Sequence, residues 1–90
     1  MQKSIITVVG KDRVGIIAGV CNYLADSNVN ILDISQTIVD GYFNMMMIAD
    51  TSNSLCDFLA LSDGLEELGK KMGVIIKLQK EEIFTQMQRV

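Results

Sequence analysis

The chain has 90 residues, of which 49% are hydrophobic, and its eight basic and eleven acidic residues give a formal net charge of -3. A chain of this length forms one small domain with a single core that is only marginally stable alone, so we expect it to dimerise. Histidine is absent, which excludes histidine-dependent hydrolases and ordinary zinc sites. We therefore predict no catalytic residues, no metal site and no cofactor.

Charge and hydropathy also restrict partners and location. A pI near 4.7, without a cluster of lysine or arginine, argues against direct binding of DNA or RNA. No apolar run approaches the ~18 residues of a membrane span, and residues 5–9 are too few for a signal-peptide core. Two cysteines, Cys21 and Cys56, are too few for a disulfide framework. We expect reduced thiols in a cytoplasmic protein that does not bind a membrane.

The first half of the chain predicts a strand and a helix. Residues 3–9 are apolar and β-branched up to Gly10, and a run that is apolar on both faces is typical of a central strand. Between residues 14 and 27 the apolar side chains recur at the three- and four-residue spacing of a helix face. Asp12 is placed to cap this helix and Asn28 to end it in the left-handed conformation.

A hairpin follows. Residues 30–39 and 42–50 flank Asp40-Gly41, which is typical of a two-residue type I′ turn. Such a turn fixes the register of the two strands. On the expected core face it pairs Ile38 with Phe43, Gln36 with Met45, Ile34 with Met47, and Leu32 with Ala49. On the opposite face it pairs Thr37 with Asn44, Ser35 with Met46, Asp33 with Ile48, and Ile31 with Asp50.

The second half predicts another helix and strand. Ser54 and Asp57 resemble a capping box, and apolar residues then recur at helical spacing as far as Met72. Lys70, Lys71 and Gly73 are typical of a helix C-terminus. Residues 74–80 predict a fourth strand. In residues 81–90 the apolar side chains of a short C-terminal helix share one side, and they are Ile83, Phe84 and Met87.

The order βαββαβ predicts an α+β fold, the ferredoxin-like sandwich. In this fold a four-stranded antiparallel sheet carries two helices on one face, and the short C-terminal helix is added to it. The chain contains no proline and no low-complexity linker. We expect one domain over residues 1–90, with a core of residues 1–80 and a C-terminal extension of residues 81–90.

The turn from the first strand into the first helix is the candidate ligand site. It does not match a phosphate loop, because Ile16 and Ile17 stand where lysine and serine or threonine are required. It offers backbone N–H groups at a helix N-terminus to a carboxylate, with no side chain at Gly15 to block approach, while Asp12 could meet an ammonium group. Such a pair of groups suits a free amino acid. Purely structural interpretations of Asp12, Gly15 and Asn30 stay open.

These segments carry a resemblance to a known family. Residues 5–17, followed by Asn28-Val29-Asn30-Ile31 and the hairpin, resemble the ACT domain, a small regulatory module that binds amino acids, over residues 1 to about 80. Within that superfamily the chain is most similar to the stand-alone, single-domain bacterial group (UPF0237-like) related to the glycine cleavage system transcriptional repressor. Residues 81–89 look like the C-terminal extension of that group.

The resemblance implies a side-by-side homodimer in which the two sheets join and an amino-acid effector binds at the interface. The implied binding residues are Asp12, Val14, Gly15 and Ile16 in the loop of one subunit and Asn30 and Ile31 in the second strand of its partner. Many family members carry proline where this chain has Val14, which implies a less rigid loop. Because no catalytic or DNA-binding domain is attached, the resemblance also implies a regulatory protein partner.

Two other functions stay open at the level of sequence. A small hydrolase of the acylphosphatase type would bind a phosphate with Arg13 and orient a water with Asn44, although the glycine-rich cradle expected around such an arginine is absent. A ligand-free dimerisation adaptor would use the same surfaces without an effector.

Overall fold

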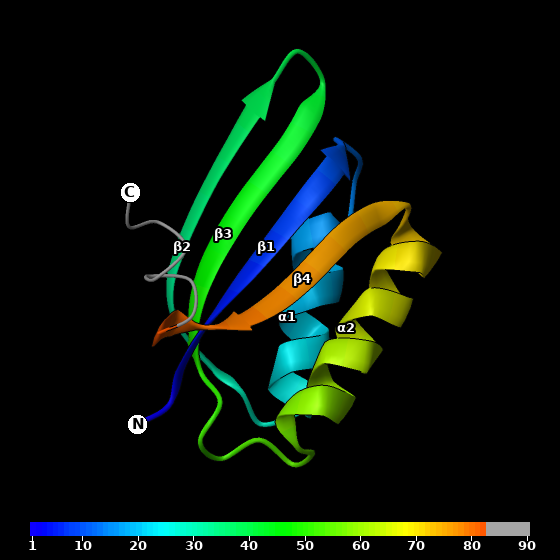
Figure 1. Cartoon of the computed structure of the whole chain (residues 1–90). Helices are drawn as coiled ribbons and strands as arrows, with labels where there is room; N and C mark the ends of the chain where they lie inside the picture. Colours follow the sequence, from blue (N-terminus) through cyan, green and yellow to red (C-terminus); the bar gives the residue numbers. More distant parts are fainter. Residues whose placement is uncertain (83–90) are drawn as a thin grey trace.

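The computed structural model describes residues 1–82 and contains a four-stranded antiparallel sheet packed against two helices (Figure 1). The elements are β1 (Lys3–Lys11), α1 (Ile16–Asp26), β2 (Asn30–Val39), β3 (Tyr42–Asp50), α2 (Phe58–Met72) and β4 (Val74–Lys80). The strand order is β2-β3-β1-β4, and in Figure 1 α1 lies behind the sheet and α2 lies beside β4. The predicted ferredoxin-like fold is confirmed. Of the C-terminal helix predicted within residues 81–90, residues 83–90 lie outside the described residues.

The hydrophobic core lies between the sheet and the helices. β1 is central, as its apolar character predicts, and pairs with β3 on one side and β4 on the other. Each helix presents one stripe of buried side chains at four-residue spacing, as an amphipathic helix does. The stripes are Ile16, Val20 and Leu24 on α1 and Leu61, Leu65 and Gly69 on α2. Neither helix within residues 1–82 has the length and apolar composition to cross a membrane.

The hairpin register is confirmed over most of its length. Asp40 and Gly41 have φ values of 54° and 80°, as a type I′ turn requires. The predicted pairs from Ile38–Phe43 to Asp33–Ile48 all occur. The last pair on each face is wrong, because a β-bulge between Ile31 and Asp33 adds an extra residue to β2. As a result Ala49 pairs with Ile31 instead of Leu32, and Asp50 pairs with Asn30 instead of Ile31.

The expected burial of β2 is also wrong. On β3 the core face is buried as predicted, including Met47. The residues of β2 that pair with this face of β3 are open to solvent, and Ile34 is 41% exposed and Ile38 58% exposed. The reason is the strand order, which places β2 at the sheet edge, where the helices leave its residues exposed from Leu32 to Val39. Apolar side chains therefore line an uncovered edge strand.

The first helix begins later than predicted. α1 starts at Ile16 instead of Val14, because Gly15 has a φ of 92° and is the N-cap residue. Residues other than glycine rarely adopt this left-handed conformation, and a residue in this conformation cannot form part of a right-handed helix. Among residues 1–82 no side chain caps α1, so the predicted capping role of Asp12 is wrong. The predicted left-handed stop at Asn28, with a φ of 60°, is confirmed.

The second helix has a different cap from the one predicted. The Asp57 carboxylate accepts a hydrogen bond from the Ala60 N–H at 2.8 Å and is the N-cap of α2. The capping box from Ser54 is wrong, since the Ser54 hydroxyl accepts a bond from the Cys56 N–H within the preceding turn. The C-terminal signals are confirmed, because Gly73 ends the helix in the left-handed conformation.

Gly69 brings α2 unusually close to β4. A Cβ added at this position would lie 2.7 Å from the Val74 carbonyl oxygen and 3.3 Å from the Ile76 nitrogen. Both contacts are with backbone, which has little freedom to move away from an added methyl group. The close approach of helix and strand therefore requires glycine here.

We predict that Gly69→Ala lowers the free energy of unfolding by about 1–3 kcal/mol, although alanine is the better helix former. The added methyl group forces α2 away from β4. Urea unfolding followed by circular dichroism measures the effect, and Asp63→Ala on the exposed face of the same helix is the control. A Gly69→Ala protein as stable as the wild type would contradict this packing.

Candidate functional site

The N-terminus of α1 carries unpaired backbone donors. The first helical hydrogen bond runs from the Gly19 N–H to the Gly15 carbonyl at 2.9 Å. The N–H groups of Ile16, Ile17 and Ala18 therefore have no partner within the helix, as at any helix start. No side chain replaces that partner, and a Cβ at Gly15 would meet no atom within 4 Å. The free N–H groups and the helix dipole therefore favour the binding of an anion at the start of α1.

The side chains of this loop differ in what they can do. Val14 is fully exposed, whereas Ile16 is only 2% exposed and belongs to the core. Ile16 can therefore reach a ligand only through its backbone N–H. The Asp12 carboxylate is exposed, and within residues 1–82 it forms no hydrogen bond or ion pair. The loop thus combines free N–H donors with one free carboxylate.

Two contacts that the sequence does not predict hold the loop in place. The Asp12 N–H donates to the Gly41 carbonyl at 2.9 Å, which joins the loop to the hairpin turn. The Arg13 guanidinium donates through Nη1 to the Met72 carbonyl at 2.9 Å, where a cation complements the C-terminus of α2. Arg13 and Met72 are 59 positions apart, so no local pattern could indicate their contact.

The other two predicted residues lie at the far end of the sheet. Lys11 pairs with Tyr42 at one end of β1, and Lys3 pairs with Asp50 at the other. Asn30 is the partner of Asp50 on the next strand, so about 25 Å of β1 separates it from the loop. The Asn30 side chain is exposed, whereas Ile31 packs partly into the core. One copy of the chain does not bring the two groups together.

The residues of the hydrolase hypothesis do not meet either. The Arg13 guanidinium lies at the end of α2, in the helix layer. Asn44 stands between the buried Phe43 and Met45 on β3, so its side chain is on the opposite face of the sheet. A phosphate held by Arg13 would be separated from Asn44 by the sheet itself.

A polar cavity of about 280 Å³ lies where α1 ends and β2 begins. Its lining residues are Ala25, Asn28, Val29, Asn30, Asp50 and Asn53. One oxygen of Asp50, Oδ1, accepts three hydrogen bonds, from Ser52 Oγ at 2.6 Å, Ser52 N at 3.0 Å and Gln2 N at 3.3 Å. The Ser52 hydroxyl, and then its N–H, hold the pKa of Asp50 below the ordinary value.

The sequence does not indicate that Asp50 lines a cavity. The signal available was Asp50-Thr51-Ser52 at a strand end, because an aspartate commonly accepts the N–H two residues ahead in such a turn. That signal fixes the carboxylate but does not say which groups surround it. The other residues that line the cavity come from the end of α1 and the start of β2.

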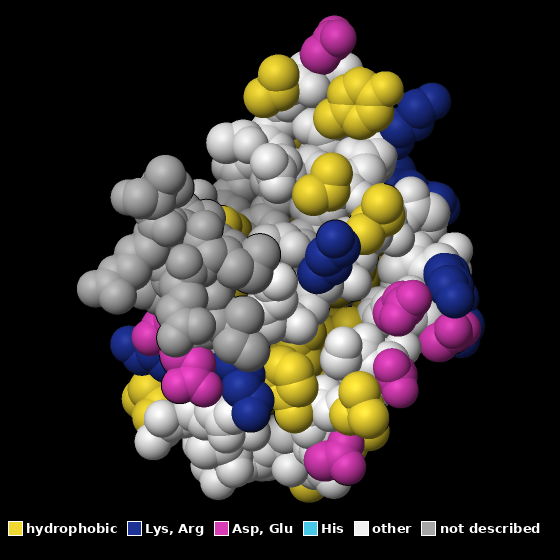
Figure 2. Space-filling view, viewed as in Figure 1, with side chains coloured by type: hydrophobic (Ala, Val, Ile, Leu, Met, Phe, Trp, Pro, Cys, Tyr) yellow, Lys and Arg dark blue, Asp and Glu magenta, His cyan; other side chains and the backbone are white. Residues whose placement is uncertain are grey.

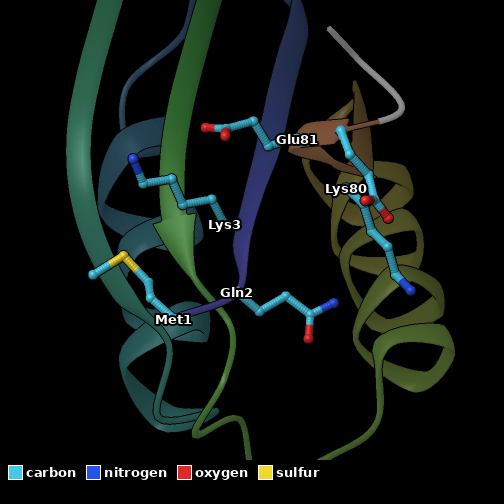
Figure 3. A pocket seen from close by; sticks show the side chains of 6 residues that line it. Met1, Gln2, Lys3, Lys80 and Glu81 are labelled. Carbon is cyan, nitrogen blue, oxygen red and sulfur yellow. The ribbon is translucent and has the colours of Figure 1, made fainter. Parts of the chain in front are cut away.

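Another cavity, of about 510 Å³, lies between the N-terminal segment and the end of β4 (Figure 3). It is lined by Met1, Gln2, Lys3, Lys80, Glu81 and Glu82. The labelled side chains do not converge, and Gln2 and Lys3 extend in opposite directions. Among the described residues there is also no group of three or more metal-binding side chains. This second cavity offers no fixed set of groups to a ligand.

The sheet face away from the helices is mixed in character. Figure 2 shows hydrophobic side chains on this face, mainly towards the hairpin end, separated by polar and positively charged groups. Exposed members include Val9, Tyr42 and Ile75. Because apolar side chains scattered in this way are normal on a protein surface, this face indicates no ligand or partner.

Comparison with known proteins identifies close relatives. A family model described as ACT domain matches residues 2–79. A UPF0237 protein from Bifidobacterium longum (strain NCC 2705) is 63% identical over 90 residues, which is 100% of both chains. The solved structure of an ACT domain protein from Streptococcus pneumoniae superposes with a TM-score of 0.81 at 46% identity, covering 92% of this chain and 93% of that one. A structure named for the glycine cleavage system transcriptional repressor gives a TM-score of 0.73 at 25% identity, covering 88% of this chain and 45% of that one.

We predict that Ser52→Ala raises the pKa of Asp50 towards the ordinary aspartate value of about 3.9, because the shortest of its three hydrogen bonds is removed. In the wild type the ionised carboxylate stabilises the fold above that pH, and this stabilisation is lost as the pH falls through the lowered pKa. A ¹³C NMR titration of the carboxyl carbon measures the pKa, with Ser62→Ala as the control. An unchanged pKa in Ser52→Ala would contradict the assignment of its cause.

Proposed function

The chain belongs to the ACT domain family, and from this premise we propose that it is a regulatory, non-enzymatic sensor in which a free amino acid binds between two copies of the chain. The observation that carries the proposal is the set of three unpaired N–H groups at the start of α1, left uncapped behind Gly15. We propose further that ligand occupancy is transmitted to a regulatory protein partner in the cytoplasm. Residues 1–90 act as one domain, with residues 81–90 as an extension of the core.

The loop supplies one half of the site. The N–H groups that follow Gly15 bind the ligand carboxylate, because the helix dipole and the unpaired donors both favour a negative charge there. Val14 lies exposed beside them, and Asp12 adds a negative charge that suits an ammonium group. A small zwitterion therefore suits the site, with its carboxylate at these N–H groups and its ammonium at an acidic side chain.

A second copy supplies the other half. β2 is an edge strand whose residues are exposed from Leu32 to Val39, and such an edge is a template for pairing with another chain. When two β2 strands pair antiparallel about a two-fold axis, the start of each lies near the end of the other. Asn30 and Ile31 of one copy then approach the loop of its partner. The loop and the start of β2, which lie far apart within one chain, come close together across the dimer.

The exposed apolar side chains on β2 support this dimer. Ile34 and Ile38 point to the same side as the core but lie beyond the helices. On α1 the buried stripe contains Val20, and Tyr23 faces α2, where a Cβ at Gly64 would overlap its hydroxyl. By helical periodicity Ile17 then faces the β2 side, and it is 37% exposed. Two such edges together bury apolar groups that one copy leaves in water.

We predict that at least one free amino acid raises the melting temperature of the wild-type protein. A ligand at about 100 times its dissociation constant adds roughly 2.7 kcal/mol to the native state, which is a shift of several degrees for a domain of this size. Gly15→Val should abolish the shift, because a β-branched side chain is strained at a φ of 92° and blocks the N–H groups. Thermal-shift measurements with each of the twenty protein amino acids at millimolar concentration make the test.

The control variant is Leu59→Ala, which removes an exposed side chain of α2 and should keep the wild-type response. No shift with any amino acid would reject the sensor and favour the ligand-free adaptor. A shift that survives in Gly15→Val would show that the ligand binds elsewhere.

A further inference from the structure

The cavity at Asp50 is built around one free carboxylate oxygen. All three hydrogen bonds to this side chain converge on Oδ1, and within residues 1–82 no donor reaches Oδ2. Lys3 stands opposite Asp50 on β1, but within residues 1–82 the two side chains form no ion pair. The ion pair among these residues joins Lys70 and Glu67 on α2. Asp50 is therefore a fixed anion with one oxygen available to a ligand.

Two amide side chains add further acceptors to the same cavity. Asn28 is held in the left-handed conformation, and its Nδ2 donates to the Asn53 carbonyl at 2.9 Å, which leaves its Oδ1 as a free acceptor. The Asn30 side chain makes no hydrogen bond in the described part of the chain. The residues that line this cavity of about 280 Å³ thus include one carboxylate and two amide side chains.

This set of groups matches the chemistry of a primary ammonium. An ammonium group has three N–H donors and a single positive charge, which three acceptors including one carboxylate satisfy. A calcium ion would need six to eight oxygen ligands, and no cluster of three metal-binding side chains exists among residues 1–82. A cationic nitrogen is the better fit.

We propose that this cavity holds the ammonium group of the bound amino acid, with Asp50, Asn28 and Asn30 as its acceptors. The inference rests on the proposed function, because the carboxylate of the same ligand would bind the loop of the second copy. It assigns the ammonium to Asp50 rather than to Asp12, whose side chain is held by no hydrogen bond within residues 1–82. Asp50 is fixed before the ligand arrives, so less ordering is required on binding.

The test compares Asp50→Asn with Asp12→Asn by isothermal titration, using as probe whichever protein amino acid gives the largest thermal shift with the wild type. Asp50→Asn retains an oxygen that can accept the bonds from Ser52 and Gln2, so we expect it to fold. The Asp50→Asn substitution should raise the dissociation constant of the amino acid about 10- to 100-fold, as expected when a charged hydrogen bond is lost. N,N,N-trimethylglycine, which keeps the charge but has no N–H donor, should not bind.

Asp26→Asn is the control, because it also removes one negative charge, at the residue that follows Ala25 of the cavity wall. It should change the dissociation constant less than threefold. If Asp50→Asn does not fold, Asn28→Gly replaces it, since glycine keeps the left-handed backbone and removes one acceptor. Wild-type affinity in Asp50→Asn, or in Asn28→Gly, would overturn the inference while the sensor stands. If no amino acid binds the wild type, the proposed function fails and this inference fails with it.

Discussion

The length of β1 separates the two groups of residues that the proposed site requires. Because β1 crosses the whole sheet before the chain turns into α1, the uncapped helix start lies at one end of the sheet and Asn30 at the other. No rearrangement of loops within one copy can close a distance of about 25 Å. Under the proposed function each copy therefore carries two half-sites, and a second copy related by a two-fold axis completes them. Marginal stability in so short a chain favours the same association.

The loop that carries the free N–H groups is held at both sides. The Asp12 N–H is bonded to the hairpin turn, and the Arg13 side chain is bonded to the end of α2. A ligand that binds these N–H groups therefore acts on a segment that connects the sheet edge with the second helix. Under the proposed function, this connection is the route by which ligand occupancy reaches the outer surface of the domain and the partner protein.

The sequence predicts the fold better than it predicts the site, for physical reasons. Periodicity and the Asp40-Gly41 turn determine the elements and most of the hairpin register, because both depend on neighbouring residues. The bulge at Leu32, the cap at Asp57 and the exposure of Ile34 depend on how complete elements pack. The same is true of Arg13 and Asp50, whose partners come from distant segments. The sequence singles out Gly15 for its missing side chain, but its left-handed conformation depends on the folded turn and displaces the helix start that periodicity alone predicts.

The claim that two copies share each site can be tested by mixing two defective chains. Gly15→Val damages the loop half and Asn30→Ala damages the strand half, so neither homodimer should bind an amino acid. In the heterodimer, the intact loop of one chain meets the intact strand of the other at one of the two sites. Isothermal titration of purified heterodimer should then find one site per dimer with wild-type affinity. Heterodimers that bind no amino acid, while the wild type binds two per dimer, would contradict a site shared between copies.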